Sequence, residues 1–167
     1  RAALPQIVEH GGQVIFVGSI YSHANGMLAS PYAVSKAGVE ALGRALRTEL
    51  APLGASAGVV YFGWVDTDLV RDSLDRQEGG RGARILEEIL PAFLLKRISP
   101  ATAGAALVRA IERRSPRTFA PPVWRYISAF RGLLNPLLDR RMDRDPRIAA
   151  IVAEVEAAAT GTQAPTR

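Results

Sequence analysis

The sequence contains no cysteine, which excludes disulfide bonds, a thiolate nucleophile and sulfur-rich metal sites. Histidine is nearly as scarce, because only His10 and His23 are present, so we expect no bound metal. No stretch of about 18 apolar residues occurs, and we therefore expect no membrane-spanning helix. The first residues also lack the basic-then-apolar layout of a signal peptide, and we predict a cytoplasmic location.

Lysine is rare as well, and arginine supplies nearly all of the positive charge. Residues 1–78 contain six basic and eight acidic residues, whereas residues 79–167 contain fifteen basic and eight acidic ones. The arginines of the second half alternate with acidic residues, and no nucleic-acid-reading motif accompanies them. We interpret them as a solvated helix face and predict no nucleic-acid partner.

The 167 residues are enough for one domain, and their 48% apolar share is ordinary for a globular protein. Two short apolar stretches, residues 13–19 and 57–63, indicate strands buried on both faces, as parallel strands are. A long helix is expected between them over residues 31–50, with Pro31 in its first turn and "APLG" at its end. Strand, helix and strand in this order predict a right-handed parallel crossover in an α/β fold.

The remaining sequence predicts shorter elements around this unit. A helix that begins at Pro100 has Ser99 as its expected cap, and "RTFAPP" indicates a last short strand. Further helices are expected at residues 69–77, 85–95 and 148–159. We predict two regions, residues 1–121 as the body of the domain and residues 122–167 as a variable helical tail.

Tyr32 and Lys36 are four residues apart near the start of the long helix, a spacing that places two side chains on one face. A phenol has a reference pKa near 10, and a cation held within about 4–6 Å favours the phenolate. The pair can therefore act as a general acid and base near neutral pH. Ser19 ends the first strand, and ligands of open parallel sheets sit beyond such carboxyl ends. Its hydroxyl could donate a hydrogen bond to a substrate oxygen there.

These residues resemble the active-site pattern of the short-chain dehydrogenase/reductase family. In "VGSIYSHANGMLASPYAVSKAG" a serine stands thirteen residues before a Tyr-x-x-x-Lys, and "YFGWVDTDLV" is similar to the family's Pro-Gly-x-Val-x-Thr segment, with phenylalanine in place of proline. The resemblance implies a Rossmann-like parallel sheet with flanking helices and hydride transfer between an alcohol or carbonyl substrate and NAD or NADP. It implies that Tyr32 is the acid/base, that Lys36 acidifies Tyr32 and holds the nicotinamide ribose, and that Ser19 orients the substrate. Gly63, Val65 and Thr67 would belong to the segment that contacts the nicotinamide.

Two parts of the family pattern do not occur in the sequence. It contains no glycine-rich phosphate turn after a first strand, and neither asparagine stands on a helix before the strand at residues 13–19. We therefore expect the C-terminal portion of such a domain, lacking the N-terminal half of the fold. The alternative is a catalytically incomplete scaffold that uses its long helix to oligomerise. In the resembling family this helix commonly packs against its own copy, which implies a homo-oligomer through residues 31–50, and the alanines and Gly38 along it would permit that.

Other interpretations of the polar residues are weaker. Ser19 and His23 do not form a serine hydrolase motif, because the Gly-x-Ser-x-Gly turn is missing, and we interpret His23 as a loop residue near the substrate mouth. Asp66 and Asp68 lack the further oxygen ligands that a metal ion requires, and Asp68 is expected to cap a short helix.

The stretch at residues 122–142 combines aromatic residues and leucines with arginines. Such a helix could lie weakly on an anionic membrane surface. We favour the simpler interpretation, a helix that covers the substrate cleft or a subunit contact.

Overall fold

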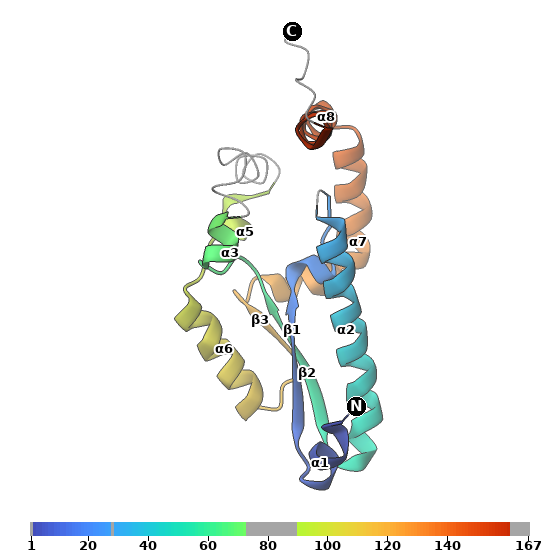
Figure 1. Cartoon of the computed structure of the whole chain (residues 1–167), viewed down its shortest axis with the longest axis vertical. Coiled ribbons are helices and arrows are strands. Elements are labelled where there is room, and N and C mark those ends of the chain that lie inside the picture. Colours follow the sequence, from blue (N-terminus) through green and yellow to red (C-terminus); the bar gives the residue numbers. More distant parts are fainter. Residues whose placement is uncertain (1, 28, 73–89, 161–167) are drawn as a thin grey trace.

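The computed structural model describes all residues except 1, 28, 73–89 and 161–167 (Figure 1). Its centre is a parallel sheet of three strands in the order β1-β2-β3. The strands are β1 (Gln13–Ser19), β2 (Ser56–Phe62) and β3 (Arg117–Ala120). The α/β fold class and the predicted strands are confirmed, the second strand being shifted by one residue.

The three strands end at the same level. Ser19 at the end of β1 pairs with Phe62 of β2, and Phe62 pairs in turn with Ala120 of β3. Because the strands are parallel, their carboxyl ends form one continuous edge, which we call the carboxyl rim. This rim is where an open α/β sheet presents its ligands.

Two helices lie on opposite sides of the sheet (Figure 1). Helix α2 (Ser30–Leu50) joins β1 to β2, and α6 (Pro100–Glu112) precedes β3. Helix α2 approaches the sheet closely at Gly43, where a Cβ atom would stand only 2.4 Å from Cγ2 of Val59. The predicted cap of α6 is confirmed, since the Ser99 hydroxyl accepts a hydrogen bond from the Thr102 N–H at 3.1 Å.

The other described helices complete the fold. They are α1 (Leu4–Glu9), η1 (Ile20–Ser22), η2 (Ala51–Leu53), α3 (Asp68–Val70), α5 (Ala92–Leu95), α7 (Trp124–Asp143) and α8 (Pro146–Thr160). Within the described residues, the helix expected at residues 85–95 begins only at Ala92, because Pro91 is extended and forms its N-cap. The rest of that helix and most of the one expected at 69–77 lie outside the described residues. Among the helices described, none is both long and apolar enough to cross a membrane.

The apolar side chains form two clusters. One lies between the sheet and helices α1 and α2, around Leu50, Ala55 and Ala57. The other lies beyond the carboxyl rim, where Ile20, Trp64, Leu94 and Trp124 pack together. The second cluster therefore forms an apolar wall beside the rim.

The expectation that the first strand is buried on both faces is wrong for the described structure. Val17 of β1 is 48% exposed, and most residues of the strand are only half-buried. The reason is position, since β1 is the edge strand of the described sheet and α6 contacts β2 and β3 instead. The central strand β2 does match the prediction, because all of its residues between Ala57 and Tyr61 are buried.

Candidate active site at the carboxyl rim

Ser19 lies where β1 reaches the rim. The side chain is 6% exposed, and its hydroxyl accepts a hydrogen bond from the backbone N–H of Tyr21 at 3.2 Å. This bond caps η1, the single turn that carries the chain away from the strand. The turn is tied to α2 as well, because the Ser22 hydroxyl donates to the Lys36 carbonyl at 2.9 Å. The local sequence thus fixes the Ser19 hydroxyl in place at the strand end.

Tyr32 and Lys36 lie in the first two turns of α2, next to the same edge. The Lys36 ammonium is 5.5 Å from the centroid of the Tyr32 ring and donates a hydrogen bond to the Val17 carbonyl at 3.2 Å. Val17 is only two residues before Ser19 on β1. Tyr32 is 43% exposed, so its phenol is accessible from solvent. The structure therefore brings the predicted pair together and anchors the lysine to the strand that carries Ser19.

Tyr21 connects Ser19 with Tyr32. Its backbone binds Ser19, while its ring packs edge-on against Tyr32 with the centroids 5.5 Å apart. The same ring also meets Trp64 edge-on at 6.1 Å. Sequence reasoning did not find Tyr21 or Trp64, although each stands two residues after the end of its strand, a position that faces the rim in a parallel sheet.

The environment distinguishes among the tyrosines. Burial, assisted by the neighbouring Tyr32, raises the pKa of Tyr21 above its ordinary value. Burial, and then the negative charge of Glu40, raises the pKa of Tyr61 to about 12. Neither of these two phenols is suited to exchange protons near neutral pH.

The segment after β2 is held by backbone pairing and one tight turn. The Gly63 N–H donates to the Ala120 carbonyl at 2.9 Å, and Val65 forms a parallel bridge with Ile98. Glycine is required at position 63, because a Cβ there would lie 2.7 Å from Nε1 of Trp124. The predicted segment therefore begins at the rim, where Trp124 packs on Gly63.

Thr67, and not Asp68 as expected, caps the short helix α3. Its hydroxyl accepts from the Val70 N–H at 3.4 Å, and Asp68 is the first helical residue. Asp68 and Asp66 instead bind Arg71, at 3.0 and 2.8 Å. Both acids therefore share one guanidinium as their partner. No group of three potential metal-ligating side chains occurs in the described part of the chain.

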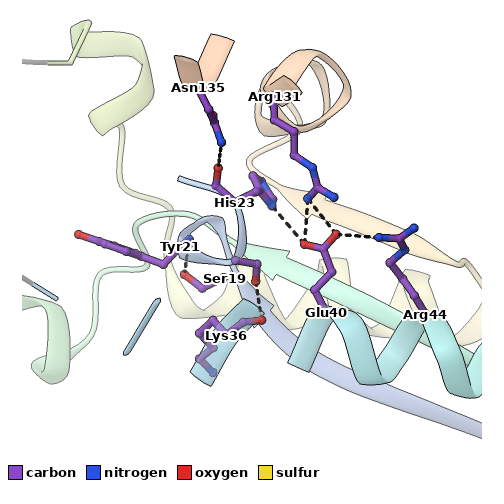
Figure 2. Close-up of polar contacts among 9 residues, drawn as sticks. Ser19, Tyr21, His23, Lys36, Glu40, Arg44, Arg131 and Asn135 are labelled. Atoms are coloured by element: carbon purple, nitrogen blue, oxygen red, sulfur yellow. Dashed lines mark hydrogen bonds and ion pairs between the residues drawn. The ribbon is translucent and has the colours of Figure 1, made fainter. Parts of the chain in front are cut away.

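His23 does not lie at an open substrate mouth. It is buried, and its ring stands beside Glu40 of α2 with Nδ1 3.5 Å from Oε2 (Figure 2). Arg131 of α7 contacts both oxygens of Glu40 at 2.9 and 3.1 Å, and Asn135 donates to the His23 carbonyl at 2.8 Å. A cavity of about 520 Å³ lies here between α2 and α7. Its lining includes Ser22 and Ala37 but none of the three predicted catalytic residues.

The charge on Glu40 is stabilised although the side chain is 7% exposed. Burial by itself raises the pKa of this carboxyl. The contacts with His23 and Arg131 outweigh burial, and the pKa lies below the ordinary value. Sequence reasoning missed this cluster, because a single glutamate on a helix gives no sign of a partner 91 residues further along the chain.

Comparison with known proteins agrees with the geometry of the rim. Residues 1–78 match the family described as short chain dehydrogenase. The matched region contains Ser19, Tyr32, Lys36 and the segment after β2.

Individual relatives show the same likeness. The 3-oxoacyl-[acyl-carrier-protein] reductase MabA of Mycobacterium bovis is 36% identical over 69 residues, 41% of this chain and 28% of that protein. A crystal structure of a short chain dehydrogenase from Burkholderia cenocepacia in complex with NADP superposes with a TM-score of 0.62 at 21% identity, covering 84% of this chain and 53% of the other. An actinorhodin polyketide ketoreductase with NADPH gives a TM-score of 0.52 at 26% identity, covering 63% of this chain and 42% of the other. The chain thus spans about a third of the length of the curated relatives and about half of these solved structures.

Proposed function

We propose that the chain is the C-terminal portion of a short-chain dehydrogenase/reductase that interconverts an alcohol and a carbonyl with NAD or NADP. One observation carries the proposal. The accessible Tyr32 phenol stands at the carboxyl rim with the Lys36 ammonium beside it, and Ser19 ends the adjacent strand. The match of residues 1–78 to the short chain dehydrogenase family supports it, as do the NADPH and NADP named in the titles of similar structures.

The rim residues fit the nicotinamide end of such a cofactor. An ammonium carries three donors, and the bond to the Val17 carbonyl uses one of them, so Lys36 can also hold ribose hydroxyls. The contacts of the Thr67 hydroxyl with Val65 and Val70 are long, at 3.4 Å, and the hydroxyl can turn toward a carboxamide. When bound, the cofactor supplies or accepts the hydride at the substrate carbon.

The proton step belongs to the side chains of the chain itself. In the reducing direction, Tyr32 donates its phenolic proton to the substrate oxygen as that oxygen becomes negative. The Lys36 ammonium stabilises the phenolate that remains, because an adjacent cation favours the charged form. The Ser19 hydroxyl holds the substrate oxygen with a hydrogen bond. In the oxidising direction the Tyr32 phenolate takes the proton back.

The wall of the site indicates an apolar or aromatic substrate beside the reacting carbon. The Tyr21 ring lies next to Tyr32 and in turn meets Trp64, which packs with Trp124 and Ile20 in the same apolar cluster. Such a wall buries apolar area and orients a ligand with few polar contacts.

The alternative function is a scaffold that uses α2 for self-association. It is supported by the outer face of α2, where Val34 and Leu42 are 71% and 55% exposed. Gly38 is exposed between them, so a second helix could approach closely there.

The substitution Tyr32→Phe separates the two functions when it is made in the protein that carries this chain. An enzyme should lose turnover of NAD(P)H by roughly 10²–10⁴-fold, the usual contribution of general acid–base catalysis. The matched control is Tyr126→Phe on the exposed side of α7, which should keep wild-type turnover. A scaffold would keep its oligomeric state, measured by light scattering, in both variants. Undiminished turnover in Tyr32→Phe would reject the assigned role.

A further inference from the structure

Helix α7 has two faces of different character. Its inner face packs on the domain, where Trp124 and Ser128 are buried, Arg131 binds Glu40 and Asn135 binds the His23 carbonyl. Its outer face carries four apolar side chains that are between 53% and 66% exposed. In Figure 1 the helix runs along the outside of the molecule, beside the N-terminal part of α2 and beyond it. These four residues are Tyr126, Phe130, Leu133 and Leu137.

The outer face changes from apolar to basic along its length. The four apolar residues follow one another at steps of four, three and four, which keeps them on one side of a helix. The same steps lead on from Leu137 to Arg140 and Arg141 and then to Arg144, all of which are exposed. We call this set, Tyr126 to Leu137 followed by the three arginines, the α7 stripe. At about 1.5 Å per residue it extends roughly 27 Å.

The acidic residues of α7 lie off the stripe. Asp139 accepts a hydrogen bond from Asn25 at 2.9 Å and so faces the loop after η1. Asp143 lines a small cavity together with Asn25, Met27 and residues of α8. At the other end, the Arg125 guanidinium stacks on the Tyr126 ring at 4.5 Å. The apolar part of the α7 stripe is therefore bordered by cations at both ends.

We propose that the α7 stripe binds an anionic lipid surface, with α7 lying in the plane of the interface. Phenylalanine and leucines on a convex helix enter the boundary between headgroups and acyl chains without needing a shaped groove. Tyr126 suits the headgroup level, where tyrosine is enriched. The arginines extend their apolar stems along the boundary and place their charge against lipid phosphates.

A second copy of the chain is a poorer occupant of this face. Two α7 stripes packed in parallel would place three arginines against three arginines. Packed antiparallel, they would place Arg140, Arg141 and Arg144 against the Arg125 end of the partner. Like charges oppose one another in both arrangements, whereas an anionic membrane attracts both ends.

Vesicle flotation of the 167-residue chain tests the proposal. Vesicles of equal parts phosphatidylcholine and phosphatidylglycerol should carry the chain to the top of the gradient, and vesicles of phosphatidylcholine alone should not. Each arginine near an anionic surface contributes roughly fivefold in partitioning, so Arg140→Gln with Arg141→Gln should weaken binding roughly 30-fold. Phe130→Ser with Leu133→Ser should abolish it. The matched control, Val34→Ser with Leu42→Ser on the exposed face of α2, should bind as the wild type does.

Three results would overturn the proposal. The first is absence of binding to the anionic vesicles. The second is equal loss in the α7 and α2 variants, which would show a general effect of apolar surface. The third is a dimer in light scattering that only the Phe130 and Leu133 substitutions dissociate, without vesicle binding, which would assign the face to a second copy. Circular dichroism of every variant confirms that the fold is kept, since all of the substituted side chains are exposed.

Discussion

Removing Arg131 should destabilise the protein strongly, although the residue is not one of the proposed catalytic residues. The substitution Arg131→Met leaves Glu40 buried, with His23 at 3.5 Å and Arg44 at 3.9 Å as its remaining partners. Breaking a buried ion pair by removing one member costs about 3–5 kcal/mol. The Arg131 side chain is 31% exposed and solvent screens part of the interaction, so we expect the lower end, about 3 kcal/mol.

Thermal and urea unfolding, followed by tryptophan fluorescence, measure this loss. In a chain of this size 1 kcal/mol shifts the melting temperature by about 2–4 °C, so Arg131→Met should melt roughly 6–12 °C below the wild type. Arg140→Met, an exposed arginine of the same helix, should stay within about 0.5 kcal/mol. Adding Glu40→Leu to Arg131→Met should recover most of the loss, because an apolar pair can replace a buried ion pair at little cost.

The same cluster predicts how stability changes with pH. The pKa of Glu40 is lower in the folded protein than in the unfolded chain, so its contribution is complete above the unfolded value, near 4.3. The contribution disappears as the pH falls through the folded value. Between about pH 5 and pH 3 the wild type should lose more stability than Glu40→Gln does. Parallel acid curves for the two proteins, or a loss below about 0.5 kcal/mol in Arg131→Met, would refute the argument.

Two further predictions concern the rim. Gly63→Ala should destabilise the protein by about 1–3 kcal/mol in urea unfolding, because the new Cβ would stand 2.7 Å from Nε1 of Trp124. The control Gly104→Ala, with open space around it in α6, should instead stabilise the protein by about 0.5–1 kcal/mol. Equal effects of the two substitutions would contradict the close approach at Gly63. The 167-residue chain should bind NADH and NADPH weakly when it is titrated with either and followed by fluorescence of Trp64. The reason is that the sequence contains no glycine-rich turn after a strand to hold the phosphates. Tight binding of either dinucleotide would contradict this expectation.

Local sequence signals predicted most of the framework. Proline in the first turn, a serine cap and β-branched runs act over a few residues, and they correctly placed α2, α6 and the strands. The spacing of Tyr32 and Lys36 also correctly predicted that these side chains meet. Their catalytic roles, and that of Ser19, stay predictions.

The features that the sequence did not predict depend on distant contacts. The burial of Glu40 results from Arg131, which only the path of α7 brings close. The exposure of Val17 results from the position of β1 at the sheet edge, which periodicity alone does not reveal. Thr67 and Asp68 are both good capping residues, and the backbone geometry of the loop decided between them.

In the proposed function, Lys36 both binds the ligand and, through its hydrogen bond to the Val17 carbonyl, links α2 to β1. A ligand that draws the Lys36 ammonium toward itself weakens its hydrogen bond to the Val17 carbonyl, and a change that loosens α2 from β1 frees the ammonium from that bond. The proposed function therefore predicts that ligand binding and the packing of α2 against β1 are thermodynamically linked, each altering the other by the same free energy.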